Sequence, residues 1–139
     1  MDAPLKADHK TILVVEDTAF VLKSVRMILE KADFTVLAAA SAQEALRLAG
    51  SAETIHLLLS DVMMPDMSGP DLALKLKEQR PDMRVILMSG YSGGGMLVLN
   101  HGWSFITKPF VPVQLVAKIR EVLLEETSDQ ATDHFDSRA

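Results

Sequence analysis

The sequence predicts a single α/β domain built on a doubly wound, five-stranded parallel sheet. Short β-branched apolar runs alternate with segments whose apolar residues recur at helical spacing, which is typical of a parallel sheet covered by helices on both faces. The runs are apolar throughout rather than at every second residue, which indicates strands buried on both faces. A chain of 139 residues is long enough for one core but too short for two ordinary domains.

The first half of the chain supplies three strands and two helices. Residues 18–32 carry apolar side chains at a spacing that gives one buried helical face. Ser41 and Glu44 form a capping-box pattern at the start of a second helix, which Gly50 is expected to end. The strands are expected at residues 11–15 (TILVV), 34–39 (FTVLAA) and 55–59 (IHLLL).

The second half continues the alternation. We expect helices at residues 70–79 and 112–126, each opened by a proline in its first turn, and strands at residues 84–88 (RVILM) and 103–107 (WSFIT). Gly93, Gly94 and Gly95 fall where another helix should begin. Three glycines cost about 3 kcal/mol relative to alanine in a helix interior, so this helix is expected to be short or partly melted.

Composition excludes several classes of function. The net charge is −5 and no cluster of Lys or Arg occurs, so the chain lacks the electrostatic footprint of a nucleic-acid binder. The absence of cysteine excludes disulfides, thiolate metal sites and thiol nucleophiles. No apolar run is long enough to span a bilayer, and the N-terminus lacks the apolar core of a signal peptide. We therefore expect a cytoplasmic protein.

Polar residues collect at the ends of the predicted strands. Glu16 and Asp17 follow the first strand, Asp61 the third, Ser89 the fourth and Lys108 the fifth. The carboxyl ends of parallel strands share one edge, where open α/β sheets bind their ligands. Asp61 alone is also a good turn residue, and the acidic pair could simply cap the next helix. The co-location of all five favours one shared site.

Three carboxylates in one place require a cation, because they would otherwise repel one another. Oxygen ligands without Cys or paired His suit Mg²⁺ better than Zn²⁺, and Mg²⁺ commonly binds together with phosphate oxygens. A lysine and a serine beside such a metal are suited to bind the remaining phosphoryl oxygens. The sequence therefore predicts a magnesium site that handles a phosphoryl group.

Four motifs in this order resemble the receiver domain of bacterial two-component response regulators: the acidic pair ED (16–17), DVMMP…G (61–69), LMSG (87–90) and TKPF (107–110). The resemblance implies a flavodoxin-like (βα)5 fold with strand order 2-1-3-4-5. It also implies a receiver domain at residues 11–126, flanked by an N-terminal extension (1–10) and a flexible polar tail (127–139).

The resemblance also implies a role for each site residue. Asp61 would accept a phosphoryl group, and Lys108 would pair with Asp61 and then with the phosphoryl oxygens. Asp17 would bind Mg²⁺, or Mn²⁺ in its place, directly, and Glu16 would hold the metal through water. The backbone carbonyl of Met63 would be a further ligand.

Ser89 and Phe105 match the two positions that respond to phosphorylation in this family. Ser89 would donate a hydrogen bond to a phosphoryl oxygen, and Phe105 would be the aromatic switch residue. The resemblance also implies a cis Lys108-Pro109 peptide bond, which is plausible because cis bonds are essentially confined to X-Pro and occur in tight turns.

The expected function is a phosphoacceptor module that changes a partner-docking surface rather than a classical enzyme, although receivers catalyse their own phosphorylation and dephosphorylation. The phosphodonor would be a phosphohistidine on a sensor kinase or a phosphotransfer protein. An output protein or a second copy would read the result. The alternatives are a receiver that binds partners without phosphorylation and, less favoured, an aspartyl-nucleophile phosphatase, whose second Asp would stand where Met63 does. The chain is compatible with a stand-alone receiver or with part of a longer regulator or hybrid kinase.

Overall fold

The computed structural model describes residues 9–90 and 102–136. Its five parallel strands are β1 (Thr11–Val15), β2 (Thr35–Ala39), β3 (Leu57–Asp61), β4 (Arg84–Ser89) and β5 (Ser104–Thr107). Its helices are α2 (Ala19–Lys31), α3 (Ala42–Ser51), α4 (Gly69–Lys77) and α6 (Pro112–Asp136). The strand order is β2-β1-β3-β4-β5, which confirms the predicted doubly wound sheet.

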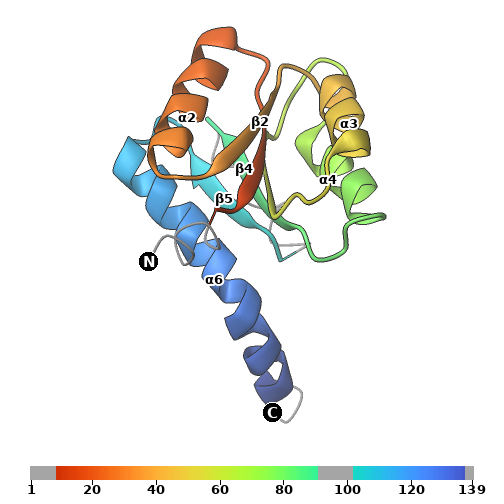
Figure 1. Ribbon diagram of the computed structural model, residues 1–139, viewed down its shortest axis with the longest axis vertical. Helices are drawn as coiled ribbons and strands as arrows, with labels where there is room; N and C mark the ends of the chain where they lie inside the picture. The colour runs from red at the N-terminus through yellow and green to blue at the C-terminus, as the bar shows by residue number, and fades with distance from the viewer. Residues whose placement is uncertain (1–8, 91–101, 137–139) are drawn as a thin grey trace.

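In Figure 1, helices α2 and α6 lie on one face of the sheet and α3 and α4 on the other. A hydrophobic layer fills the space between the sheet and each pair of helices. Strand β1 shows how the continuous apolar runs serve both layers. Ile12 and Val14 face the α2 and α6 side, whereas Leu13 and Val15 face the α3 and α4 side, and all four are fully buried. Full burial of such a side chain contributes about 1.5–3 kcal/mol, so the central strands anchor the domain.

Several element boundaries differ by one or two residues from the sequence-based expectation. Strand β3 spans Leu57–Asp61 rather than 55–59, because its pairing with β4 continues through Ser60 and Asp61 after the apolar run has ended. Helix α3 continues through Gly50 to Ser51. Asp61 is therefore the last residue of a buried strand, where backbone pairing fixes its position.

The C-terminal helix departs further from the sequence-based expectation. Residues 127–136, expected to form a loose tail, continue α6 as a single helix of 25 residues. After Pro112 the helix meets neither proline nor glycine, and each added residue contributes one backbone hydrogen bond. In Figure 1 the C-terminal part of α6 extends beyond the α/β body. The helix expected near Gly93 lies outside the described residues.

None of the helices in the described ranges combines the length and the apolar character that crossing a bilayer would require.

The C-terminus of α2 shows how a local motif stops a helix and turns the chain into β2. Asp33 has a left-handed backbone, with φ of 74°. The Phe34 amide donates to the Leu29 carbonyl, and the Asp33 amide donates to the Glu30 carbonyl, both at 3.0 Å. This is the Schellman pattern, which satisfies carbonyls that the helix end leaves without partners.

We expect Asp33→Gly to raise the free energy of unfolding by about 0.5–1 kcal/mol, because glycine adopts positive φ without a Cβ clash. The neighbouring Ala32 has an ordinary φ of −92° and serves as the control. Ala32→Gly should lower stability, since there glycine only adds freedom to the unfolded chain. Urea unfolding measures both, and a destabilised Asp33→Gly variant would contradict the argument.

Candidate metal centre

Strand register brings the sequence-predicted side chains to one edge of the sheet. Val15 is level with Ser60 in the β1–β3 pair, and Asp61 is level with Met88 in the β3–β4 pair. Backbone pairing continues one residue past two strands. The Glu16 amide donates to the Ala39 carbonyl at 3.1 Å, and the Lys108 amide donates to the Ser89 carbonyl at 2.8 Å. Glu16, Asp61 and Lys108 thus start from fixed backbone positions.

Lys108 joins the two buried acids. Its ammonium lies 2.7 Å from Glu16 Oε1 and 2.7 Å from Asp61 Oδ1. The Glu16 and Asp61 side chains are only 1% and 8% exposed, whereas that of Lys108 is 27% exposed. The pairing of Lys108 with Asp61 was expected from the family resemblance, but the equally short contact with Glu16 was not.

The pKa values of the two carboxyl groups shift in opposite directions, because burial and hydrogen bonding affect the two groups differently. Burial, together with the adjacent Glu16 and against the opposing effect of Lys108, raises the pKa of Asp61 from 3.8 to about 7. Burial also acts to raise the pKa of Glu16, but hydrogen bonds with Asp61, Lys108 and the Thr18 amide lower it on balance. Below a pH of about 7 the metal-free pair therefore favours an ionised Glu16 beside a protonated Asp61.

Glu16 also caps the helix that follows it. Its Oε2 accepts a hydrogen bond from the Thr18 amide at 3.0 Å, whereas the side chain of Thr18, at the N-cap position of α2, makes no capping bond. Capping by the acidic pair was one of the sequence-based alternatives. Glu16 serves both as a cap and as a member of the site.

Asp17 completes an acidic cluster. One carboxylate oxygen from each of Glu16, Asp17 and Asp61 lies within 4.8 Å of the others, and Asp17 is exposed to solvent. Three oxygen donors with one solvent-facing member suit Mg²⁺, which keeps several waters and takes one or two carboxylates. The donor set therefore fits a hard divalent ion.

The remaining predicted residues lie in β4, in β5 and in the loop that follows β3. Ser89 is buried at the end of β4, and Phe105 in β5 is partly buried against the α3 and α4 layer. The Met63 side chain is 74% exposed on the loop after Asp61. The Lys108-Pro109 peptide bond is cis. The roles of these residues toward a metal or a phosphoryl group remain predictions.

Gly69 allows the loop after β3 to close on the site. A Cβ at this position would lie 2.1 Å from the Asp61 carbonyl oxygen, and the Gly69 amide donates to the Val62 carbonyl at 2.7 Å. Only glycine permits this approach of two backbone segments. The sequence motif contained this glycine, but its contact with Asp61 could not be predicted without the tertiary structure.

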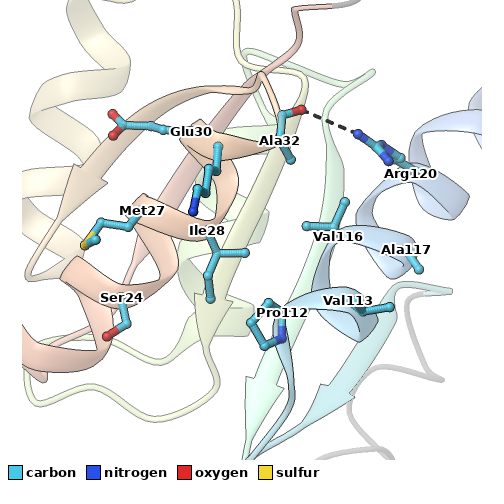
Figure 2. Close-up of a pocket in the computed structure, with 11 residues that line it drawn as sticks. Ser24, Met27, Ile28, Glu30, Ala32, Pro112, Val113, Val116, Ala117 and Arg120 are labelled. Carbon is cyan, nitrogen blue, oxygen red and sulfur yellow. Dashed lines mark hydrogen bonds between the residues drawn. The ribbon is translucent and has the colours of Figure 1, made fainter.

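A separate groove of about 1090 Å³ lies between α2 and α6 (Figure 2). Its walls are mainly apolar, with Met27, Ile28, Val113 and Val116 among them. Glu30 is the acid among its lining residues. None of the clustered carboxylates lines it, so the groove is distinct from the acidic site.

The fold and the site together define a class: an open parallel α/β domain with an acidic cluster, bridged by a lysine and suited to a divalent ion, at the carboxyl edge of its sheet. The family model of the response regulator receiver domain matches residues 12–120. The chain belongs to the response regulator receiver domain family, and its acidic cluster and Lys108 occupy the pocket of a two-component signalling module.

Similar proteins agree with this assignment. Sensor kinase CckA of Brucella abortus is 33% identical over 138 residues, which is 88% of this chain and 15% of the kinase. The phosphate regulon regulator PhoB of Pseudomonas aeruginosa is 35% identical over 119 residues, 82% of this chain and 52% of PhoB. The chain thus spans well under two thirds of these relatives.

Solved structures share the whole fold. The crystal structure of a CheY-like receiver domain protein from Methanospirillum hungatei is 36% identical with a TM-score of 0.78, covering 86% of this chain and 98% of the other. The receiver domain of the hybrid histidine kinase CckA is 34% identical with a TM-score of 0.71, covering 81% and 98%.

We expect Gly69→Ala to lower the free energy of unfolding by about 2–3 kcal/mol, because the added methyl group forces two backbone segments apart. Gly50 in α3 is the matched control, since a Cβ there meets nothing within 4 Å. Gly50→Ala should raise stability by about 0.5–1 kcal/mol through helix propensity. Urea denaturation measures the stability of both variants. Equal effects would show that the backbone contact between Gly69 and Asp61 does not require glycine.

The raised pKa of Asp61 predicts a pH dependence of stability in metal-free buffer. Between pH of about 4 and about 7 the folded state holds a proton on Asp61 that the unfolded state has lost, so stability falls as pH rises through this range. Asp61→Asn removes this loss. As pH rises from about 4 to about 7, the free energy of unfolding of Asp61→Asn should increase relative to that of the unmodified protein, as measured by urea unfolding in EDTA. A constant difference would refute the assignment.

Proposed function

We propose that the domain is a Mg²⁺-dependent phosphoacceptor in which Asp61 receives a phosphoryl group from a phosphohistidine of a sensor kinase or a phosphotransfer protein. The observation that carries this proposal is the 2.7 Å contact between the Lys108 ammonium and Asp61 Oδ1, within 4.8 Å of two further carboxylates. A carboxylate beside an ammonium and a metal-binding cluster is arranged to take up a phosphoryl group.

The transfer is an in-line displacement at phosphorus. A carboxylate oxygen of Asp61 forms the new O–P bond while the N–P bond of the phosphoimidazole breaks. The electron pair of that bond returns to the imidazole nitrogen, and the product on Asp61 is an acyl phosphate. Catalysis of this kind relies on positioning and on neutralising the charge of the phosphoryl oxygens.

A bound divalent ion would supply much of that positive charge. Glu16, Asp17 and Asp61 and the backbone carbonyl of Met63 would hold Mg²⁺, or Mn²⁺ in its place. The nearby cation would also favour the ionised form of Asp61, whose pKa burial raises to about 7 without metal. Metal binding thereby prepares Asp61 as a nucleophile.

Lys108 would stabilise the phosphorylated product through its ammonium group. It already contacts Asp61 in the unphosphorylated domain, so a phosphoryl group on Asp61 would lie within reach of its ammonium. In the proposal, Ser89 binds a phosphoryl oxygen and Phe105 responds by changing its packing. Ser89 lies in β4, which pairs with β3, and Phe105 lies in the edge strand β5. The altered surface would be read by an output protein or by a second copy.

We expect incubation with acetyl phosphate and Mg²⁺ to give a single acid-stable, hydroxylamine-labile phosphoryl adduct, detected by intact mass. Asp61→Asn should abolish the adduct, because the amide cannot act as the nucleophile. Asp71→Asn, at an exposed carboxylate in the first turn of α4, should keep it.

Absence of an adduct on the unmodified chain, or an undiminished adduct on Asp61→Asn, would overturn the proposed function. Omission of Mg²⁺ should reduce the yield strongly, and full yield in EDTA would remove the metal from the reaction.

A further inference from the structure

The loop between β3 and α4, residues 62–68, would carry the carbonyl ligand of Met63. Backbone bonds hold its two ends. The Val62 amide donates to the Met88 carbonyl at 2.9 Å, and the Gly69 amide donates to the Val62 carbonyl at 2.7 Å. Between these ends, a side chain of the loop makes a third attachment, through Asp66.

Asp66 reaches across to the first turn of α3. Its Oδ2 accepts a hydrogen bond from the Gln43 amide at 3.0 Å, and its Oδ1 accepts one from the Ala42 amide at 3.3 Å. First-turn amides have no acceptor within their own helix, and the positive end of the helix dipole favours an anion there. The hydrogen bond from Gln43 is the main reason why the pKa of Asp66 is lowered, so the ionised form is the one that binds.

Helix α3 already has caps of its own. Ser41 Oγ accepts a hydrogen bond from the Glu44 amide at 3.1 Å, and Glu44 Oε1 accepts one from the Ala40 amide at 2.8 Å. Asp66 is therefore not needed to mark the start of the helix. What Asp66 adds is a connection between α3 and a loop that follows it by 23 residues in sequence.

The side chain of Met63 provides no comparable anchor, because it is 74% exposed. Met64 and Met67 are partly buried against the α3 and α4 layer, so the loop keeps its general path without Asp66. The orientation of the Met63 peptide must then come from the attachments on either side, and Asp66 is three residues away.

We propose that Asp66 is a positioning residue for the metal: by fixing the loop to the first turn of α3, it directs the Met63 carbonyl toward the acidic cluster. The inference rests on the proposed function, in which that carbonyl is a metal ligand. Asp66 acts through the loop and does not touch the metal.

Calorimetric titration of the full chain with Mg²⁺ tests this role. Asp66→Ala should weaken Mg²⁺ binding by about tenfold, the lower end of the effect of residues that orient metal ligands. Asp66→Asn keeps one acceptor oxygen, so its Mg²⁺ affinity should lie between that of the unmodified chain and that of Asp66→Ala. Asp71→Ala removes the same charge near the same loop and should leave the affinity close to that of the unmodified chain.

A variant on the other side of the contact gives an independent test. Gln43→Pro removes the amide that donates to Asp66, and a proline is tolerated at this helical position, as Pro70 is in α4. It should weaken Mg²⁺ binding in the same direction. In the double variant, Gln43→Pro should weaken Mg²⁺ binding little beyond the effect of Asp66→Ala, because Asp66→Ala already removes the carboxylate that the Gln43 amide contacts.

The readouts separate this inference from the proposed function. Saturating Mg²⁺ should restore much of the phosphorylation by acetyl phosphate that Asp66→Ala loses at low Mg²⁺, because Asp61 and Lys108 are intact. Asp17→Asn is the control that removes a direct ligand. Failure of the unmodified chain to bind Mg²⁺ would overturn both proposals.

Other outcomes overturn the positioning role alone. These are an unchanged affinity in Asp66→Ala, an equal loss in Asp71→Ala, which would indicate charge rather than position, or fully additive losses in the double variant. Thermal melting of each variant accompanies the titrations. If Asp66→Ala melts below the assay temperature, Asp66→Asn and Gln43→Pro give the decision.

Discussion

Two carboxylates are buried side by side at the carboxyl edge of the sheet, and one ammonium makes this arrangement tenable. Glu16 and Asp61 are almost completely removed from solvent, and both contact Lys108 at 2.7 Å. A buried ion pair adds little stability compared with hydrophobic packing, but a buried charge that loses its partner is strongly destabilising. The position of β5, which places Lys108 beside β4, is therefore a requirement of the site as much as of the sheet.

The sequence predicted the sheet well because its signals are local. Continuous apolar runs indicate buried parallel strands, and prolines and capping residues mark most of the helix starts. The same signals failed where the outcome depends on neighbours. The pairing of Asp61 with Met88 extends β3 beyond its apolar run, and α6 continues past the expected end because nothing in its sequence stops it.

The site could be predicted as a set of residues but not as a set of contacts. Strand ends of a parallel sheet coincide, so Asp61 and Lys108 were expected to meet. Which acid shares the ammonium is decided by side-chain geometry, and the sequence holds no signal for the bond between Lys108 and Glu16. The attachment of Asp66 to α3 and the approach of Gly69 to Asp61 likewise exist only once loop and helix are packed.

Lys108 and Glu16 are 92 residues apart in sequence, and they meet only after β3 and β4 have been inserted between their strands. Closing a loop of this length costs conformational entropy, which the contacts between the completed strands must offset. A nascent or partly folded chain therefore lacks the complete site. The two buried acids thus acquire their ammonium partner only when the edge strand β5 is paired with β4.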